Sequence, residues 1–255
     1  MSGDFAGEVA VVTGGGTGLG LAITRGLLAR GARVVIASRN AAHHETIRAE
    51  AAAKGWALET RVLDVREPVA VERAAAEIGP VDVLVNNAAG NFVCPAERLS
   101  ASAWRSVVSI ALDGTFFCSR YFGKPMIARG RGGRILNVIA TYAETGMPGV
   151  VHSASAKAGV LAMTKTLAAE WARHGIRVNA IAPGPFESEG AAANLWPDDA
   201  ARERLLGAIP LGRFGTAEEV AAHALYLLSP ACTWVTGATF TVDGGMSLPA
   251  GLWRE

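Results

Sequence analysis

The chain has 255 residues, of which half are hydrophobic, and its 24 Lys and Arg nearly balance its 23 Asp and Glu. This length is normal for one open α/β sheet, and the balance of charge excludes a basic field for nucleic acid. Cys94, Cys118 and Cys232 form no paired or metal-ligand spacing, so we expect reduced thiols, no metal and a cytoplasmic protein.

Short runs rich in Val and Ile alternate with helical patterns along the chain. Seven runs predict strands, at 9–12, 34–37, 60–65, 81–85, 134–139, 176–182 and 239–242. Because these runs lack polar alternation, we expect strands buried on both faces of one parallel sheet built from βαβ units. No linker or repeat divides the chain, so we expect one domain over 1–255, with the nucleotide-binding part at about 7–185.

Helical patterns lie between these runs. The first covers 19–29, and an Ala- and Glu-rich one covers 40–54 and includes His43 and His44, which we expect to be solvated. Thr216-Ala-Glu-Glu219 is a capping box that opens a helix ending at Leu228. The longest uncharged stretch, 220–242, is interrupted by polar residues, which favours a buried helix followed by a strand over a membrane span. The start of the chain, 1–4, lacks a signal-peptide pattern, so we expect no membrane partner.

The first predicted strand runs into the turn Thr13-Gly-Gly-Gly-Thr-Gly-Leu-Gly20, which opens the first helix. Glycine lets a backbone approach a pyrophosphate closely, and the helix N-terminus offers free N–H groups. A strand before the turn and a helix after it favour a dinucleotide site over a plain glycine-rich turn. The cofactor-binding residues expected here are Gly14, Gly16, Thr17, Gly18, Leu19 and Gly20.

The end of the second strand decides between NAD and NADP. An acidic residue there would bind the ribose hydroxyls of NAD and repel a 2′-phosphate. Here the strand ends Ala37-Ser38-Arg39, and its hydroxyl and guanidinium suit a phosphate, so we expect NADP(H) as the cofactor. The alternative is that Arg39 is an ordinary solvated side chain.

Three further turns follow later strands, at the edge of such a sheet where ligands bind. Asp64-Val65 can reach the adenine, Asn86-Asn-Ala-Ala-Gly90 follows the fourth strand, and Pro183-Gly-Pro185 follows the sixth, near the expected nicotinamide. Each alone is a turn signal, but together they indicate a nucleotide site. The cofactor-binding residues expected from these turns are Asp64, Val65, Asn87, Ala88, Pro183 and Gly184.

As a set, these motifs resemble the short-chain dehydrogenase/reductase family. The matching strings are the glycine turn at 13–20, NNAAG at 86–90, PGP at 183–185, VTGA at 235–238 and VDGG at 242–245. The resemblance covers roughly 7–247. It implies an α/β fold with one Rossmann-type doubly wound parallel sheet, a nicotinamide cofactor and usually a homotetramer.

The chain departs from the family at the reacting residues. Most members place a Tyr four residues before a Lys, on one helix face. Lys157 matches that Lys, which would hold the nicotinamide ribose, but Ser153 stands in the Tyr position, and the family's usual Asn falls near Ala111. A serine hydroxyl has a far higher pKa than a phenol, so ordinary alcohol–ketone interconversion is not expected.

Longer strings are similar to one subfamily, the 2,4-dienoyl-CoA reductases. These strings are NNAAGNF at 86–92, PAERLS at 95–100, TYAETG at 141–146 and SASAKAG at 153–159. In that subfamily a Tyr fifteen residues before the Lys serves the active site; here it is Tyr142, at the edge of the fifth strand. An Asn after the NNAAG run assists it, here Asn91, and Ser153 belongs to the pattern. The subfamily's Thr after PGP corresponds to Ser188, which keeps the hydroxyl at the cofactor.

The resemblance implies NADPH-dependent reduction of a 2,4-dienoyl-CoA to an enoyl-CoA in unsaturated fatty acid β-oxidation. Hydride addition to the far conjugated carbon sends negative charge to the thioester oxygen, which needs hydrogen-bond donors aimed at it. We expect these donors to be the Tyr142 hydroxyl and the Asn91 amide, with Tyr142 or a water supplying the proton. Ser153 would help to position the cofactor or Lys157.

Other interpretations stay open. Tyr142 can be a wall aromatic and Asn91 a turn residue, and we do not expect His152 to be catalytic. The chain can also be a general NADP-dependent carbonyl or 3-oxoacyl reductase, or a catalytically silent NADP(H)-binding oligomer. We expect a substrate loop at 186–210 that ends in a short helix, and Arg202, Arg204 and Arg213 are available for the CoA phosphates.

Overall fold

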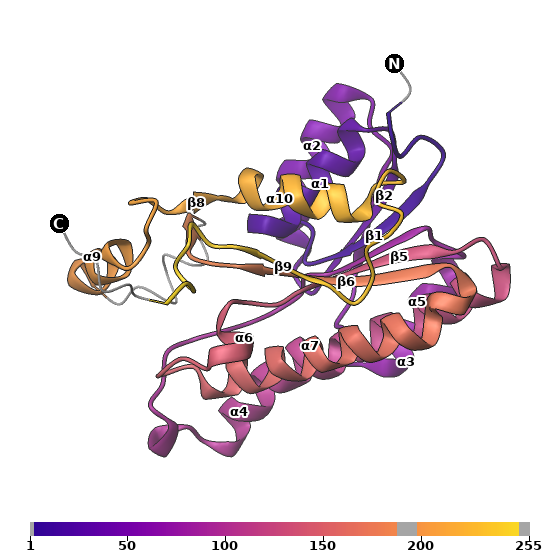
Figure 1. Ribbon diagram of the computed structural model, residues 1–255. Helices are drawn as coiled ribbons and strands as arrows, with labels where there is room; N and C mark the ends of the chain where they lie inside the picture. Colours follow the sequence, from indigo (N-terminus) through magenta and orange to yellow (C-terminus); the bar gives the residue numbers. More distant parts are fainter. Residues whose placement is uncertain (1–2, 188–197, 250–255) are drawn as a thin grey trace.

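A central parallel sheet organises the molecule (Figure 1). The computed structural model describes residues 3–187 and 198–249, and within them seven parallel strands pair in the order β3-β2-β1-β4-β5-β6-β9. The strands are β1 (Val9–Thr13), β2 (Arg33–Ser38), β3 (Leu58–Val62), β4 (Val83–Asn86), β5 (Gly133–Val138), β6 (Ile176–Pro183) and β9 (Thr239–Val242). The order reverses between β1 and β4, so the predicted doubly wound α/β fold is confirmed.

Helices cover both faces of this sheet (Figure 1). One face carries α1 (Gly18–Ala29), α2 (Glu45–Lys54) and α10 (Ala217–Leu228). The other carries α3 (Pro68–Ile78), α4 (Ala101–Val108), α5 (Gly114–Arg129) and α7 (Val151–Trp171). The shorter elements are α6 (Tyr142–Thr145), α9 (Asp199–Gly207) and the parallel pair β7 (Phe186–Glu187) and β8 (Gly215–Thr216). In the part of the chain described, no helix is long and apolar enough to span a bilayer.

Successive side chains of a central strand pack into opposite layers. On β1, Val12 belongs to the cluster that contains Ile23 of α1, whereas Val11 belongs to the cluster that contains Val71 of α3 and Phe122 of α5. Both strand residues are fully buried. Burial on both faces explains why the strands read as continuous apolar runs.

A third, smaller hydrophobic cluster lies between α6, α7 and β6. Its buried members include Ala143 of α6, Val160 and Leu161 of α7, and Ala180 and Ala182 of β6. Three of its six buried members are alanines. The short helix α6 can therefore lie directly on the sheet and on α7.

The third strand is shifted from its predicted position. It covers Leu58–Val62 rather than 60–65, because its partner β2 ends at Ser38, which pairs with Val62. Leu63 donates the next hydrogen bond to the carbonyl of Ser38, and the chain then leaves the sheet. Leu63 and Val65 are buried although they lie beyond the strand, which is why they extended the apolar pattern.

The helix signals at 216–219 are confirmed. The Thr216 hydroxyl accepts a hydrogen bond from the Glu219 amide at 3.1 Å, and the Glu219 carboxylate accepts one from the Thr216 amide at 2.9 Å. The segment 40–54 is helical, but it begins with a separate 3₁₀ turn (Ala41–His44) before α2. The uncharged stretch 220–242 forms most of α10 and the strand β9, as predicted.

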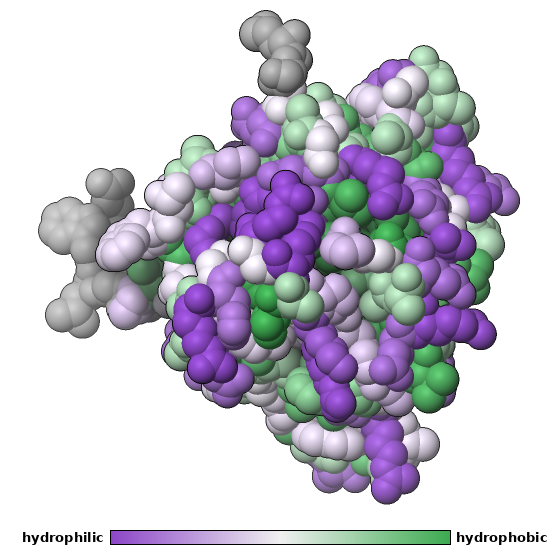
Figure 2. Space-filling model, turned by 90° about the vertical axis from the view of Figure 1, so that its right-hand side faces the viewer, coloured by the Kyte–Doolittle hydropathy of each residue, from purple (hydrophilic) through white to green (hydrophobic). Residues whose placement is uncertain are grey.

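The two ends of the sheet carry different parts of the chain. The carboxyl ends of the strands lie on the side of α6 and α9 in Figure 1, together with the loops that join them to the helices. The opposite end faces the viewer in Figure 2, where hydrophilic side chains are interspersed with separate hydrophobic ones. The carboxyl end is where ligands bind in sheets of this type.

Candidate active site

A cleft of about 990 Å³ opens at the carboxyl ends of the strands. Its walls come from the turns after β1 to β5, from α7, and from the segment after β6. Because the strand order reverses between β1 and β4, the turns after these two strands leave the sheet toward opposite faces and open a crevice between them. The cleft therefore lies where the sequence predicts a nucleotide site.

Hydrogen bonds join the glycine turn after β1 to the turn after β4. The Thr13 hydroxyl accepts from the backbone amides of Asn87 and Ala88, both at 3.0 Å. The Asn87 amide donates to the carbonyls of Thr13 and Gly14, both at 3.1 Å. Gly20 of α1 packs so closely that a Cβ there would lie 2.2 Å from the Gly14 carbonyl oxygen. The crevice therefore has a rigid floor that leaves no room for a side chain at position 20.

Most of the predicted cofactor-binding residues line this cleft. They are Gly14, Thr17, Leu19, Ser38, Arg39, Asp64, Val65, Asn87, Ala88, Lys157, Pro183 and Gly184. Gly16, Gly18 and Gly20 are not among the lining residues: Gly18 begins α1, and the other two lie where backbone segments pack closely. Ser188 lies outside the described residues.

The end of β2 presents an unpaired positive charge. Arg39 is exposed, lines the cleft, and makes no hydrogen bond or ion pair with any residue that the structure describes. The nearby Asp64 carboxylate is bound instead by the Arg66 guanidinium, whose Nε lies 2.9 Å from Oδ1. That hydrogen bond holds the pKa of Asp64 below its usual range. Arg66 therefore neutralises Asp64 and leaves Arg39 available for an anion.

His44 contradicts its prediction. It is fully buried rather than solvated, because the 3₁₀ turn after β2 folds the chain back over Ser38. Its Nε2 atom lies 2.7 Å from the Ser38 hydroxyl oxygen. The polar residues around it in the sequence gave no sign of this burial.

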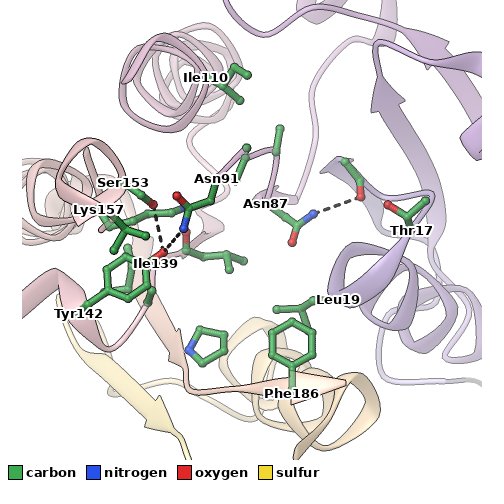
Figure 3. A pocket seen from close by; sticks show the side chains of 18 of the residues that line it. Thr17, Leu19, Asn87, Asn91, Ile110, Ile139, Tyr142, Ser153, Lys157 and Phe186 are labelled. Carbon is green, nitrogen blue, oxygen red and sulfur yellow. Dashed lines mark hydrogen bonds between the residues drawn. The ribbon is translucent and has the colours of Figure 1, made fainter. Parts of the chain in front are cut away.

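Three polar side chains converge in the opposite half of the cleft (Figure 3). Tyr142 begins α6, Ser153 lies in the first turn of α7, and Asn91 follows the NNAAG turn after β4. The Tyr142 hydroxyl lies 3.0 Å from the Ser153 hydroxyl and accepts a hydrogen bond from the Asn91 amide at 3.2 Å. The Asn91 carbonyl oxygen accepts from the backbone amide of Phe92 at 2.9 Å, which fixes the orientation of the amide.

This cluster controls the proton of Tyr142. Burial raises the pKa of the phenol, and the hydrogen bonds with Ser153 and Asn91 partly offset that rise. The phenol is therefore protonated at neutral pH. Because the Asn91 nitrogen can only donate, the proton of Tyr142 points either toward Ser153 or into the cleft.

Lys157 lies beside this cluster and is buried, with 6% of the residue exposed. Its Nζ atom donates to the Val138 carbonyl at 2.6 Å, and burial lowers its pKa to about 8. Ser153 and Lys157 stand four residues apart on α7, yet the hydrogen bond of Ser153 is with Tyr142 rather than with Lys157. Tyr142, Asn91, Ser153 and Lys157 all line the cleft, so the structure brings together the four predicted residues.

Much of the remaining cleft wall is apolar. Two residues of α9, Ala201 and Leu205, face the cleft one helical turn apart, and α9 is the short helix predicted at the end of the substrate loop. Other apolar lining residues include Val93, Ile110, Met147, Pro148, Val150, Phe186 and Met246. The sequence did not single out Val93, Met147 or Met246, although a large apolar residue in a short polar loop is a usable signal.

The remaining candidates lie outside this arrangement. His152 does not line the cleft; it is fully buried and packs edge-on against Phe92, with ring centroids 4.4 Å apart. Arg213 is bound to Glu219 at 2.7 Å. Arg202 lies 3.8 Å from Glu187 and over the ring of Phe214. These two arginines thus have partners within the chain.

Known proteins match this arrangement over nearly the whole chain. A family model described as Enoyl-(Acyl carrier protein) reductase matches residues 14–247. The chain is 43% identical over 246 residues to the "Probable 2,4-dienoyl-CoA reductase ((2E)-enoyl-CoA-producing)" of Bacillus subtilis (strain 168), covering 94% of this chain and 97% of that protein. It is 42% identical to the peroxisomal 2,4-dienoyl-CoA reductase ((3E)-enoyl-CoA-producing) of Pongo abelii, covering 93% and 83%.

Solved structures agree. A short chain dehydrogenase from Bacillus anthracis str. 'Ames Ancestor' matches with a TM-score of 0.85 at 44% identity, covering 97% of this chain and 98% of that one. A gluconate 5-dehydrogenase from Burkholderia cenocepacia J2315, in complex with NADP and tartrate, matches with a TM-score of 0.89 at 35% identity, covering 96% and 97%. From its fold, its motifs and these relatives, the chain belongs to the short-chain dehydrogenase/reductase family, resembles the 2,4-dienoyl-CoA reductases within it, and is an NAD(P)-dependent oxidoreductase.

Proposed function

We propose that the protein reduces 2,4-dienoyl-CoA thioesters to enoyl-CoA with NADPH. One observation carries the proposal: the Tyr142 phenol lies in the cleft within hydrogen-bond distance of both Asn91 and Ser153. Ser153 stands where most of the family has its reacting Tyr, so Tyr142 is the phenol available to the substrate. The names of the relatives from Bacillus subtilis and Pongo abelii support the same substrate class.

The residues of the cleft fit a nicotinamide dinucleotide. The cleft is continuous from Ser38 and Arg39, past the glycine turn, to Lys157 and Pro183. A bound nicotinamide would supply the hydride. Arg39 and Ser38 would bind the 2′-phosphate of NADPH, the α1 N-terminus would bind the pyrophosphate, and Lys157 would hold the nicotinamide ribose.

Tyr142 and Asn91 would stabilise the charge that hydride addition creates on the thioester oxygen. The Asn91 amide donates to the phenol oxygen. When the Ser153 hydroxyl also donates to it, the proton of Tyr142 is free to point at the substrate. The second amide proton of Asn91 is available to the thioester oxygen of the substrate. Two donors prearranged in a partly buried site stabilise the dienolate more than water does.

The apolar half of the cleft would hold the acyl chain. Ala201 and Leu205 of α9 and Phe186 form the wall beyond the polar cluster. Contacts of this kind reward the length of a hydrocarbon chain. This wall offers no hydrogen-bond partners to the hydroxyls of a sugar acid, which favours an acyl substrate over the gluconate of the Burkholderia cenocepacia relative.

A direct assay separates this proposal from its alternatives. NADPH oxidation is measured with a 2,4-dienoyl-CoA and with a 3-oxoacyl-CoA of equal chain length. We expect the dienoyl thioester to have the higher kcat/KM, with an enoyl-CoA as the product. Faster reduction of the 3-oxoacyl thioester would show a carbonyl reductase instead. Tight NADPH binding without turnover of either thioester would show a catalytically silent binding protein.

The proposal also includes a single domain that assembles as a homotetramer and a role in unsaturated fatty acid β-oxidation in the cytoplasm. The family resemblance supports the tetramer, and the acyl-CoA substrates in the relatives' names support the metabolic role. The three cysteines without a paired spacing support the cytoplasm. Light scattering on the purified protein measures the assembly directly. A monomeric mass at working concentration would contradict the tetramer.

A further inference from the structure

His44 is a buried imidazole beneath the 2′-phosphate end of the cleft. It ends the 3₁₀ turn Ala41–His44 and has no exposed surface. Its Nε2 atom lies 2.7 Å from the Ser38 hydroxyl oxygen, whereas Nδ1 has no hydrogen-bond partner among the residues described. Leaving a buried polar atom unpartnered costs free energy that an apolar side chain of similar size would not. Stability alone therefore does not account for a histidine at this position.

The hydrogen-bonding groups around Ser38 identify the donor. Burial lowers the pKa of His44, and the positive charge of Arg48 adds to this effect, so the ring is neutral and carries one N–H. The Ser38 hydroxyl also lies 3.1 Å from the Asn40 carbonyl, which can only accept. When Ser38 gives its proton to that carbonyl, the proton of His44 resides on Nε2 and is donated to Ser38. The orphaned Nδ1 is then an acceptor, which is less costly to bury than an unpaired N–H.

This arrangement leaves the Ser38 proton free to change partner. The Ser38 hydroxyl oxygen accepts a hydrogen bond from His44. The hydroxyl hydrogen can therefore rotate from the Asn40 carbonyl to an acceptor in the cleft. Ser38 lines that cleft beside Arg39. A phosphoryl oxygen bound by Arg39 would be such an acceptor, and hydrogen bonds to charged phosphate are among the stronger ones.

The turn that carries His44 also touches the glycine turn. A Cβ on Gly16 would lie 2.1 Å from the His43 carbonyl oxygen, so the two backbones are in contact. The Asn40 side chain caps the 3₁₀ turn by accepting from the Ala42 amide at 3.0 Å. This cap and this contact fix His44 relative to both expected phosphate positions.

We propose that His44 is a positioning residue that aims the Ser38 hydroxyl at the 2′-phosphate and so contributes to the preference for NADPH over NADH. The inference rests on the proposed use of NADPH. It assigns to His44 no contact with the cofactor and no part in the chemistry of the thioester.

The test compares two ligands that differ only in the 2′-phosphate. Binding of 2′,5′-ADP and of 5′-AMP is measured by calorimetry for the wild type and for His44→Leu, His44→Gln, Ser38→Ala and the double variant His44→Leu/Ser38→Ala. We expect His44→Leu to weaken 2′,5′-ADP binding about tenfold and to leave 5′-AMP binding unchanged. Gln keeps an amide donor, so His44→Gln should retain most of the affinity. His223→Leu, on the exposed face of α10, is the matched control.

The Ser38 variants test whether His44 acts through the serine. Ser38→Ala should lose about as much affinity as His44→Leu, and the double variant should lose no more than Ser38→Ala alone. In steady-state assays of His44→Leu, KM for NADPH should rise while kcat at saturating NADPH stays unchanged. Equal losses for 2′,5′-ADP and 5′-AMP, or additive losses in the double variant, would overturn the inference.

The proposed cofactor preference and the role of His44 fail in different ways. A wild-type protein that binds 2′,5′-ADP no more tightly than 5′-AMP would contradict the use of NADPH, and the role of His44 with it. A wild type that prefers 2′,5′-ADP, with His44→Leu keeping the full preference, would overturn the role of His44 alone. Ser38→Ala lies at a partly exposed site, so its measurement does not depend on the folding of the His44 variants.

Discussion

The hydroxyl of Ser153 lies 3.0 Å from the phenol oxygen of Tyr142, although the two residues belong to different helices. Ser153 stands four residues before Lys157 on α7, and Tyr142 reaches it from α6, at the end of β5. The phenol therefore enters the site from α6 rather than from α7, the helix that carries the lysine. This geometry makes the roles of the individual side chains separable by mutation.

Replacing the Tyr142 phenol should abolish most turnover without weakening cofactor binding. In Tyr142→Phe the ring keeps its packing but loses its hydroxyl, and removal of one such donor costs about 3 kcal/mol, or roughly 100-fold in kcat. Single-turnover kinetics with a dienoyl-CoA and NADPH measure the effect. Tyr226→Phe makes the same chemical change on the exposed side of α10 and should be neutral. A Tyr142→Phe enzyme with full turnover would remove the phenol from the mechanism.

Asn91 should act together with Tyr142. Asn91→Ala removes the amide that donates to the phenol oxygen, and we expect kcat to fall roughly tenfold. In a Tyr142→Phe background the same change should cost much less, because its partner is already gone. A double-mutant cycle on kcat measures this coupling. Independent, additive losses would show that Asn91 contacts the substrate without Tyr142.

Charge reversal at the end of β2 should change the cofactor preference. Arg39→Asp replaces the unpaired cation with a carboxylate that repels a 2′-phosphate and can accept from ribose hydroxyls. We expect kcat/KM to fall with NADPH and to rise with NADH. Arg61→Asp, on the neighbouring strand β3 and outside the cleft wall, controls for the change in net charge. An unchanged NADPH-to-NADH ratio would mean that Arg39 is a solvated side chain.

The buried Lys157 should make stability depend on pH. Its pKa is about 8 in the fold and 10.5 for the free side chain, so between these values the unfolded chain binds more protons than the folded one. The free energy of unfolding should therefore rise as the pH goes from 8 to 10.5, by about 3 kcal/mol relative to Lys157→Met. Urea denaturation of both proteins across this range gives the difference. Parallel curves would mean that the lysine has an ordinary pKa.

Gly20 should tolerate no side chain. Gly20→Ala places a Cβ 2.2 Å from the Gly14 carbonyl and 2.5 Å from the Asn87 amide nitrogen, which must move apart. We expect a loss of about 2 kcal/mol of stability and weaker NADPH binding. The control is Gly207→Ala at the end of α9, where nothing lies within 4 Å of the new methyl group. Equal melting temperatures for both variants would contradict the close packing of the turn.

The sheet and the glycine turn could be predicted well, because each of these features depends on a few residues that are adjacent in the sequence. The strand runs, the glycine turn and the capping box at Thr216 each follow from a few adjacent side chains, and the structure contains all three. Tyr142, Asn91 and Lys157 were predicted to share one site from the resemblance to the 2,4-dienoyl-CoA reductases, and all three line the cleft. Their chemical roles stay predictions.

Tertiary packing explains where the structure departs from the predictions made from the sequence. The third strand ends early because β2 ends at Ser38, and no residue within the third strand reports the length of its neighbour. His44 lies among polar residues, yet one 3₁₀ turn buries it. Tyr142 begins a helical turn instead of lying on the strand edge, because the backbone is already helical at Thr141. The apolar wall combines residues of α9 with Met147, which are distant in sequence.

The small hydrophobic cluster beneath α6 has a consequence for engineering. Ala143, Ala180 and Ala182 bring the helical turn of Tyr142 down onto β6, and α6 is only four residues long. A bulkier residue at any of these alanines would tilt that turn and misdirect the phenol, while the two large clusters keep the sheet intact. Such overpacking also lowers stability, but a melting temperature does not report where the phenol points. Activity is therefore the more direct measure of the packing in this cluster.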